Sequence, residues 1–422
     1  MTSRVLTPSS APLNAVVRVP GSKSVANRAL VCAMLADGES VISGLPDGDD
    51  TAVILDVLTQ VNRLQRLADD AVMVAGNPTG LLPGIVDAVL AGTSSRFLTA
   101  VAALGESTTI IDGGEPLRSR PMQDLHEALL ALGAELIPLG LSGHLPVSVS
   151  RGQLVGGRVS IRGDVSSQFI SSLMLIGPVL QKGLSIDIEG ELISRSYVEM
   201  TAAVMKDFGA VVVVEPNVIS ISASGYTART YSVEPDYSSA AFPIAAVLVR
   251  GGSVRIPGLA QSVMQGDAAM ADIARSMGGT VQVTGADIVV TRESGQALKP
   301  ISMNMEDCSD LVPAVAAACA VALGTSTITG VGFIRRKESD RLGDLAAEMR
   351  KAGVAVEVNE DGLTINGSAD LSAAEFDPHH DHRLAMALAL LSLVSKSATV
   401  NDSEVVSKSW PSYFEDMAPI LG

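Results

Sequence analysis

The residues best suited to chemistry lie in one short run, Arg335–Leu342, which reads Arg-Arg-Lys-Glu-Ser-Asp-Arg-Leu. Six of its first seven side chains are charged, although only 18% of the residues in the chain are charged. Strand-like sequence precedes the run, and apolar residues at helical spacing follow it, at Leu342, Leu345, Ala346 and Met349. The charges therefore belong at a helix N-terminus, where N–H groups and the helix dipole favour an anion. A solvated, self-paired charge run is the alternative, and the run alone does not decide between them.

Length and composition limit the kinds of protein that could position these charges. A chain of 422 residues is too long for one ordinary core, so two domains are expected. A hydrophobic fraction of 47%, with 39 glycines and 3% aromatic residues, favours an α/β protein with tight turns. The net charge of −16 argues against a nucleic-acid or membrane-surface partner. An anionic small molecule fits if basic side chains gather in one cleft.

Targeting and cysteine patterns indicate a cytoplasmic protein. The first residues, Met1–Val5, have no apolar core of the kind found in signal peptides. The longest apolar runs, such as Leu384–Val394, are too short to span a bilayer. Cys32, Cys308 and Cys319 are odd in number and lie among apolar residues, which argues against a disulfide framework and for a reducing compartment.

A repeat organises the chain. A polar anchor followed by an apolar helix recurs six times, each 72 residues after the last, at Ser22, Ser94, Ser166, Ser238, Asp310 and His382. Each unit continues with a strand, a second polar loop and an amphipathic helix. Several of these second helices are expected to end at a glycine, in Gly133-Ala134, Gly209-Ala210 and Gly353-Val354. Internal repeats of this kind predict stacked α/β modules, three in each of two domains.

The domain boundaries follow from the first strand. The segment 15–19 reads as a strand that could pair with the C-terminal half of the chain. The predicted first domain is then 21–234, and the second is 1–20 together with 235–422. The two chain crossings fall near Pro20-Gly21 and Pro235-Asp236.

The anchors in the first half suit anion binding. Pro20–Ser24 resembles a phosphate loop, but Ser22 stands where a Walker loop requires its second glycine. A glycine turn that opens a helix, with Lys23 and Arg28 one turn apart, can still bind an anion. Further helix starts of this kind lie at Ala91–Arg96, Arg118–Pro121 and Val165–Gln168. Each of them taken alone would be ordinary helix capping.

The anchors in the second half add acids. Asp310, Glu338 and Asp340 lie within anchor motifs, although a single Asp before an apolar helix is usually a cap and a single His is usually structural. None of the five histidines has metal-ligand spacing, and no nicotinamide fingerprint is present, so no metal or cofactor is expected. Seven basic residues fall at the helix-start loops: Lys23, Arg28, Arg120, Lys337, Arg341, Arg383 and Lys408. If the repeats bring these loops to one face, the pattern predicts acid–base chemistry on a phosphorylated substrate without a metal.

Together these motifs resemble the EPSP synthase (3-phosphoshikimate 1-carboxyvinyltransferase) family of enolpyruvyl transferases. The resemblance runs from about residue 14 to the C-terminus. The matching stretches are Pro20–Ser24 with Asn27-Arg28, Ala91–Thr93, Arg120-Pro121, Val165–Phe169, Gln265–Asp267, Lys337–Arg341, Asp381–Met386 and Lys408-x-x-Pro411-x-Tyr413-Phe414.

The resemblance implies a fold and a reaction. The fold would be α/β with two domains, each of three repeated βαβαββ units, with helices inside and sheets outside, closing on substrates. The reaction would join phosphoenolpyruvate to the 5-hydroxyl of shikimate 3-phosphate and release phosphate, on the route to chorismate. It implies a monomer with these two small-molecule substrates, no cofactor, and neither a nucleic-acid nor a membrane partner.

The resemblance also implies site roles. Asp310 resembles the base near the 5-hydroxyl, Glu338 the acid–base residue at C3 of the enolpyruvyl group, and Lys23 a further catalytic residue. The phosphoenolpyruvate clamp would be Lys23, Gly92, Arg120, Gln168, Arg341, Arg383 and Lys408. The shikimate 3-phosphate side would be Lys23, Ser24, Arg28, Ser166, Ser167, Gln168, Ser194, Tyr197, Asp310 and Lys337.

Departures from the family pattern and two alternatives stay open at this point. Leu90 and Phe333 stand where many members carry Asn, and His379-His380 replaces a common Tyr-Asn pair. One alternative is the sister enzyme that uses UDP-N-acetylglucosamine, but it relies on a reactive loop cysteine, and this chain has none near Arg118–Arg120. The other is a repeat scaffold that binds anionic partners, which would not need Asp310 and Glu338.

Overall fold

The computed structural model describes residues 2–7, 13–67, 71–395 and 397–422. The chain separates into two compact units, which we call unit 1 (Met1–Pro20 with Glu234–Gly422) and unit 2 (Gly21–Val233). The chain crosses between the units at 20–21, as predicted, and at 233–234, one residue before the predicted 234–235. Glu234 belongs to unit 1, where its carboxylate accepts hydrogen bonds from the backbone N–H groups of Val263 and Met264.

Unit 2 contains three successive repeats. The first comprises α1 (Lys23–Leu35), β3 (Glu39–Ser43), α2 (Asp49–Gln60), β4 (Leu64–Arg66), β5 (Val72–Ala75) and the late strand β14 (Thr230–Ser232). The second comprises β6 (Ile85–Asp87), α3 (Gly92–Ala102), β7 (Thr109–Asp112), α4 (Glu115–Arg118), α5 (Gln123–Ala131), β8 (Glu135–Pro138) and β9 (Val147–Ser150). The third comprises β10 (Gly157–Arg162), α6 (Ser167–Ile176), η1 (Gly177–Val179), β11 (Leu184–Glu189), α7 (Arg195–Asp207), β12 (Val212–Val214) and β13 (Val218–Ile221).

Unit 1 contains the other three. The fourth repeat comprises β2 (Leu13–Val16), α8 (Tyr237–Arg250), β15 (Gly252–Ile256), η2 (Leu259–Gln261), η3 (Gly266–Ala269), α9 (Met270–Met277), β16 (Thr280–Thr284) and β17 (Asp287–Arg292). The fifth comprises β18 (Ser302–Asn304), η4 (Glu306–Leu311), α10 (Val312–Cys319), β19 (Gly324–Thr329), η5 (Gly332–Arg336), α11 (Gly343–Lys351), β20 (Ala355–Asn359) and β21 (Gly362–Gly367). The sixth comprises β1 (Arg4–Leu6), β22 (Ala374–Phe376), α12 (His382–Leu391), β23 (Ala398–Val400), η6 (Ser403–Lys408), α13 (Tyr413–Asp416) and α14 (Ala418–Leu421).

The sheets repeat one topology, which confirms the predicted βαβαββ unit. In the third repeat β10 pairs parallel with β11, β11 antiparallel with β13, and β13 antiparallel with β12. The fifth repeat has the same order, β18-β19-β21-β20. The sixth differs from the expectation of six full units, because its described sheet has three strands, β1-β23-β22, and the short helices α13 and α14 take the place of the closing hairpin.

The two chain crossings close the first sheet of each unit. In unit 2, β14 returns from the end of the unit to pair parallel with β3. In unit 1, β2 pairs parallel with β15, so the expected pairing of the first strand with the C-terminal half is confirmed. The strand covers Leu13–Val16 instead of 15–19, because its partner strand β15 begins at Gly252 opposite Leu13.

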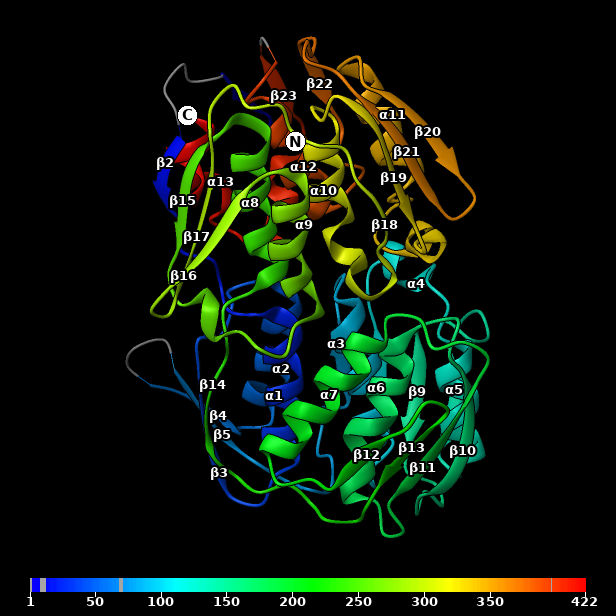
Figure 1. The fold of residues 1–422 in the computed structure, drawn as a ribbon. Coiled ribbons are helices and arrows are strands. Elements are labelled where there is room, and N and C mark those ends of the chain that lie inside the picture. Colours follow the sequence, from blue (N-terminus) through cyan, green and yellow to red (C-terminus); the bar gives the residue numbers. More distant parts are fainter. Residues whose placement is uncertain (1, 8–12, 68–70, 396) are drawn as a thin grey trace. The chain divides into compact units, whose positions relative to one another are not determined.

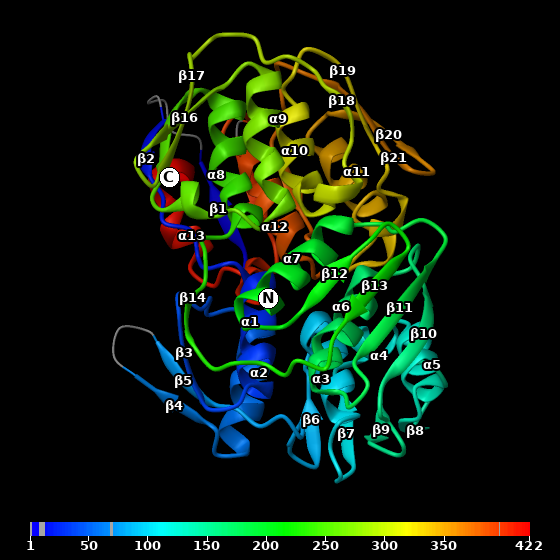
Figure 2. The same cartoon turned by 60° about the horizontal axis from the view of Figure 1, so that its bottom comes forward.

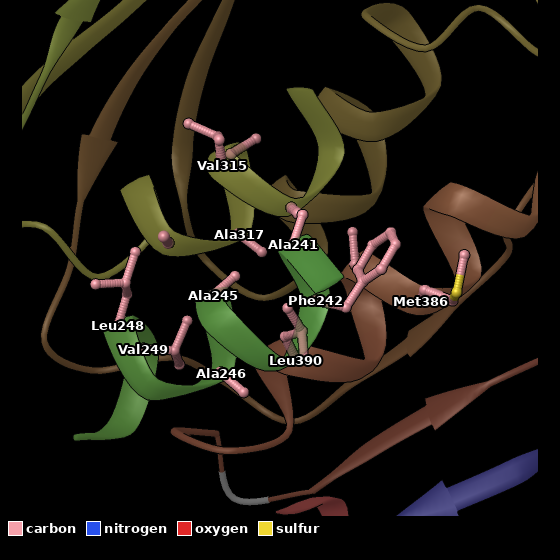
Figure 3. Close-up of a cluster of buried hydrophobic side chains, with 14 of the residues drawn as sticks. Ala241, Phe242, Ala245, Ala246, Leu248, Val249, Val315, Ala317, Met386 and Leu390 are labelled. Carbon is pink, nitrogen blue, oxygen red and sulfur yellow. The ribbon is translucent and has the colours of Figure 1, made fainter. Parts of the chain in front are cut away.

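Helices form the interior of each unit and sheets its outside (Figure 1 and Figure 2). From Val25 to Leu35 every residue of α1 is buried, which explains why its sequence is apolar apart from Asn27 and Arg28. In unit 1 the first helices of the three repeats, α8, α10 and α12, pack on one another. Figure 3 shows this contact, where small residues such as Ala241 and Ala245 on α8 lie beside Ala317 on α10. Small side chains allow the helix backbones to approach closely.

The predicted helix stops are confirmed. Gly133, Gly209 and Gly353 have φ values of 98°, 84° and 87°, which favour glycine because it has no Cβ. In each case the next residue donates its N–H to a carbonyl of the last helical turn, as Ala134 does to Leu129 at 3.0 Å. These are Schellman-type ends, and they turn the chain from the second helix into the strand that follows.

Candidate active site

The charge run of unit 1 precedes a helix, as the sequence predicted, and it extends from the last two residues of η5 to the start of α11. Asp340 acts as the helix cap, since its Oδ1 accepts the backbone N–H groups of Leu342 at 3.2 Å and Gly343 at 2.9 Å. Amphipathic α11 then buries Leu345, Ala346 and Met349. The apolar stripe thus anchors the helix, and the side chains just before it stay fixed beside the starts of α10 and α12.

Asp310 lies at the centre of an ionic network. One of its oxygens accepts hydrogen bonds from Lys337 Nζ at 2.7 Å and Arg341 Nη1 at 2.9 Å. The other accepts from Arg383 Nη2 at 3.0 Å. Burial alone would raise the pKa of Asp310, but Arg383, Lys337 and Arg341 outweigh it and hold the pKa well below its ordinary value. Asp310 is therefore an ionised carboxylate among three cations.

Glu338 lies at the edge of the same network. Its Oε2 accepts from Arg341 Nη2 at 2.7 Å, and its Oε1 lies 3.2 Å from Lys408 Nζ. We call Asp310, Lys337, Glu338, Arg341, Arg383 and Lys408 the acid–base cluster. Its members come from η4, from the run between η5 and α11, from α12 and from η6, so three helix starts and one 3-10 helix converge on it.

Asp381 orients the Arg341 guanidinium and caps the helix that carries Arg383. Its Oδ2 accepts from Arg341 Nε at 2.6 Å, and its Oδ1 accepts from Arg341 Nη2 at 3.3 Å and from the backbone N–H of Arg383 at 2.9 Å. Burial lowers the pKa of Arg341, but Asp381, Glu338 and Asp310 reverse this and raise it above its ordinary value. Asp381 belongs to a predicted motif but was not among the predicted site residues. It is also the N-cap of α12.

In unit 2 most of the predicted anion-binding residues lie at or near the starts of α1, α3, α6 and α7, and Arg120 lies between α4 and α5. Lys23, the first residue of α1, pairs with Asp50 of α2 at 2.7 Å, and the Asp50 side chain is only 2% exposed. A Cβ at Gly92, the first residue of α3, would lie 2.6 Å from Arg120 Nη1, so the backbone at Gly92 and the Arg120 guanidinium are neighbours. The sequence did not identify Asp50 as a partner of Lys23, because two acids in the first turn of a helix, here Asp49 and Asp50, are usually explained by the helix dipole.

The start of α6 also carries polar groups. Ser166 caps α6 by accepting the backbone N–H of Gln168 at 3.3 Å, and Ser167 is buried. The Gln168 side-chain oxygen accepts a hydrogen bond from Arg96 of α3. Ser194 and Tyr197 lie at the start of α7, where Ser194 has a φ of 52°. Arg96 was not among the predicted residues, and it lies one repeat period from Gln168.

Arg28 occupies a different environment from the other predicted cations. It is buried in unit 2 and donates from Nε to Thr201 Oγ1 at 2.7 Å, and from Nη1 to the backbone oxygen of Ser24 at 2.8 Å. Nη2 lies 3.2 Å from Ser171 Oγ. Burial lowers the pKa of Arg28 to about 10. Here Arg28 ties α1 to α6 and α7, and its role towards shikimate 3-phosphate stays a prediction.

Contacts between repeats show that the helices of each unit run in register. Arg96 reaches Gln168, which lies 72 residues further along the chain, and Arg383 reaches Asp310, which lies 73 residues earlier. Because equivalent positions touch, the helix starts of one unit lie at one level. The repeat therefore brings the predicted loops together within each unit.

The cysteines are buried in these packed helices. Cys32, Cys308 and Cys319 are unpaired, and burial raises their pKa values to about 12, 12 and 11. Thiols in this state are poor nucleophiles. Among the described residues no group of His, Cys, Asp and Glu forms a metal-binding cluster. Within the same part of the chain, no helix combines the length and apolar character needed to cross a bilayer.

The fold defines a class of α/β proteins, the one to which solved EPSP synthases belong. The EPSP synthase from Acinetobacter baumannii has the same fold, with a TM-score of 0.82, 24% identity, and coverage of 99% of this chain and 98% of that chain. A second structure from the same organism gives a TM-score of 0.81 at 23% identity.

Sequence relatives specify the family. The family model described as EPSP synthase (3-phosphoshikimate 1-carboxyvinyltransferase) matches residues 8–417. The 3-phosphoshikimate 1-carboxyvinyltransferase of Methanothermobacter thermautotrophicus is 40% identical over 419 residues, covering 97% of each chain. That of Sulfurovum sp. is 36% identical over 417 residues, covering 96% of each. The chain therefore belongs to the EPSP synthase family, as its motifs predicted, and the sister-enzyme alternative is not favoured.

Proposed function

We propose that this protein transfers the enolpyruvyl group of phosphoenolpyruvate to the 5-hydroxyl of shikimate 3-phosphate. The products are 5-enolpyruvylshikimate 3-phosphate and phosphate, in the shikimate pathway to chorismate and aromatic amino acids. Membership of the EPSP synthase family supports the reaction. The observation that carries it structurally is the acid–base cluster, in which two carboxylates of different surroundings share four cations.

The reaction needs three proton transfers and an anion clamp. In the first step the 5-hydroxyl oxygen bonds to C2 of phosphoenolpyruvate, loses its proton, and C3 gains a proton, giving a tetrahedral intermediate. In the second step C3 loses a proton and the C2–O bond to phosphate breaks. We assign the hydroxyl proton to Asp310 and the C3 proton to Glu338. Two carboxylates in different surroundings can serve as separate proton acceptors and donors in one site.

The cations of the acid–base cluster would also control the basicity of Asp310. Asp310, held ionised by Lys337, Arg341 and Arg383, is a weak base while all three cations contact it. Phosphate and carboxylate groups of the substrates would compete for the same donors. As the cations turn towards the substrates, the pKa of Asp310 rises, and it becomes a better acceptor for the hydroxyl proton.

We assign the binding residues separately for the two substrates. Phosphoenolpyruvate would contact Lys23, Gly92, Arg120, Gln168, Arg341, Arg383 and Lys408. Shikimate 3-phosphate would contact Lys23, Ser24, Arg28, Ser166, Ser167, Gln168, Ser194, Tyr197, Asp310 and Lys337. Helix starts with hydroxyl and N–H donors, as at Ser166 and Ser167, suit a phosphate. The assignments draw on residues of both units.

We further propose that the protein acts as a monomer in the cytoplasm. Its three unpaired, buried cysteines suit a reducing compartment. All proposed substrate contacts come from one chain. Light scattering at the concentration used for the activity assay would test the monomer, and a stable dimer would contradict it.

The decisive experiment is a phosphate-release assay with phosphoenolpyruvate and shikimate 3-phosphate, with the product identified by mass spectrometry. Parallel reactions contain UDP-N-acetylglucosamine instead, or no acceptor. We expect phosphate release only with shikimate 3-phosphate, together with the enolpyruvyl ether. Release with UDP-N-acetylglucosamine would favour the sister activity, and tight anion binding without turnover would favour a scaffold.

A further inference from the structure

The chain reaches the acid–base cluster through an unusual turn, Pro378–Asp381. The backbone N–H of Asp381 donates to the carbonyl oxygen of Pro378 at 2.9 Å, which closes a four-residue turn. Both central residues have positive φ, 51° at His379 and 58° at His380. Such turns normally take Asn and Gly, because a side chain is strained at positive φ. Two histidines at these strained positions indicate that at least one of their side chains makes a contact that offsets the strain.

The side chain of His379 is anchored on α11. Its Nε2 lies 3.0 Å from Glu348 Oε1, and the Glu348 side chain is only 3% exposed. The other Glu348 oxygen accepts from the backbone N–H of Asp377 at 2.9 Å and from Lys351 Nζ at 2.7 Å. Asp344, one helical turn before Glu348, lies 4.0 Å from His379 Nδ1. Two carboxylates on one face of α11 therefore face this imidazole.

These contacts close a ring around the start of α11. Arg341, just before α11, donates to Asp381, the last residue of the turn. His379, inside the turn, returns to Glu348 on α11. The ring fixes the turn against α11, and so it fixes Asp381, which orients the Arg341 guanidinium and caps α12 at Arg383. Loss of the His379 contact would leave the backbone N–H of Asp377 as the remaining hydrogen bond from this segment to Glu348, so the turn and Asp381 would be held less firmly.

His380 offers an internal comparison within the same turn. Its Nδ1 lies 3.0 Å from Asp402 Oδ2, but its side chain is 80% exposed. Exposed ion pairs contribute little, because water and salt screen them. The two histidines share the same backbone strain and differ in the burial of their partners.

We propose that His379 is a positioning residue that orients Arg341 and Arg383 for phosphoenolpyruvate, acting through Glu348 and Asp381. The inference rests on the proposed function for its substrate. It adds a residue outside the acid–base cluster, at a position where this chain departs from the common family pattern. His380 contributes to the turn without this role.

The test compares His379→Asn with His380→Asn, because Asn tolerates positive φ and so preserves the turn. For His379→Asn we expect the KM for phosphoenolpyruvate to rise about ten- to hundredfold, as for loss of one hydrogen bond to a charged group. The KM for shikimate 3-phosphate should change by less than about twofold. His380→Asn should leave both values within about twofold, as expected for an exposed pair.

Amide hydrogen exchange gives a readout that does not depend on turnover. The Arg383 backbone N–H donates to Asp381 Oδ1, so its exchange should become about tenfold faster in His379→Asn and stay unchanged in His380→Asn. This result in a protein without turnover would overturn the proposed function and still support the positioning. Unchanged exchange in His379→Asn, or equal changes in both variants, would overturn the positioning itself.

Glu348→Gln provides a second route to the same contact. It keeps the size of the side chain and an acceptor for the Asp377 N–H. Because His379 acts through Glu348, the double variant Glu348→Gln/His379→Asn should raise the KM for phosphoenolpyruvate no more than the larger single change does. Multiplicative effects would show that the two residues act independently, and would contradict the ring.

Discussion

The two units use the same repeat to build different kinds of polar surface. In unit 1 the helix starts carry charges bound to charges, with Asp310 and Glu338 among Lys and Arg side chains. In unit 2 Lys23 pairs with Asp50, but Arg28 is bound by hydroxyl and carbonyl oxygens, and the start of α6 presents Ser166 and Ser167. The comparison teaches that a repeated scaffold fixes where polar groups lie and leaves their chemistry to the individual residues.

The difference matters because proton transfer and binding need different surroundings. Proton transfer depends on the pKa of the carboxylate, which the three cations around Asp310 lower. A phosphate requires several donors at fixed distances, which helix starts supply without additional charge. Unit 1 is therefore expected to govern the rate of the chemical step together with part of the binding of phosphoenolpyruvate, and unit 2 to act mainly on the affinity for substrate.

The largest expected effect is on the catalytic side of this comparison. Glu338→Gln keeps the size of the side chain and an acceptor for Arg341 but removes proton transfer, so kcat should fall by about 10²–10⁴. Binding of shikimate 3-phosphate, measured by calorimetry, should change far less. Near-normal turnover in this variant would leave Glu338 only a structural role as the partner of Arg341 and Lys408.

A smaller effect is expected in unit 2. Lys23→Met removes a charged hydrogen bond and should weaken substrate binding about 10- to 100-fold, measured as the KM for phosphoenolpyruvate. It also leaves the buried Asp50 carboxylate without its 2.7 Å partner, so the melting temperature should fall. Adding Asp50→Asn should restore the melting temperature and leave the KM high. If the double variant recovers both, Lys23 has only a structural role.

The units should also respond to pH in opposite directions, beginning with Asp267 in unit 1. Burial raises the pKa of Asp267 to about 7, so the folded protein holds this proton when the unfolded chain has lost it. The free energy of unfolding should therefore fall as the pH rises from about 4 to about 7, by a few kcal/mol.

Asp267→Asn keeps an acceptor for Ser238 and removes this titration. Urea unfolding at pH 5 and pH 8 should show the variant gaining stability relative to the parent at the higher pH. Parallel pH profiles for the two proteins would contradict the buried, protonated state of Asp267.

In unit 2 the corresponding group is His126, with the opposite sign. Burial, together with nearby His144, lowers the pKa of His126 to about 4. Between about pH 4 and 6.5 the unfolded chain therefore binds a proton at this position that the folded protein does not bind. Stability is lost as the pH falls from about 6.5 towards 4, by up to about 3 kcal/mol. His126→Leu should flatten this acid limb in urea unfolding measurements. An unchanged limb would show that other groups cause the loss.

Much of the fold was readable from the sequence because it depends on local rules. The glycine helix stops and the apolar stripe of α11 follow from residues close together in the sequence. The period of 72 residues can be seen by comparing the chain with itself. All three appear in the structure. The shortened sixth repeat was not readable, because its sheet is completed by β1 from the other end of the chain. The family motifs likewise could be recognised in order along the chain.

What the sequence could not determine is which charged groups meet. Arg341 binds Asp381, 40 positions away, and Asp310, 31 positions away, and both choices depend on how α10, α11 and α12 pack. Lys and Arg side chains are long and have many rotamers, so a sequence indicates that a cation is present but not its partner. Only packing fixes those partners, because it sets the positions of the helix starts and the burial that raises the pKa of Asp267 and lowers that of His126.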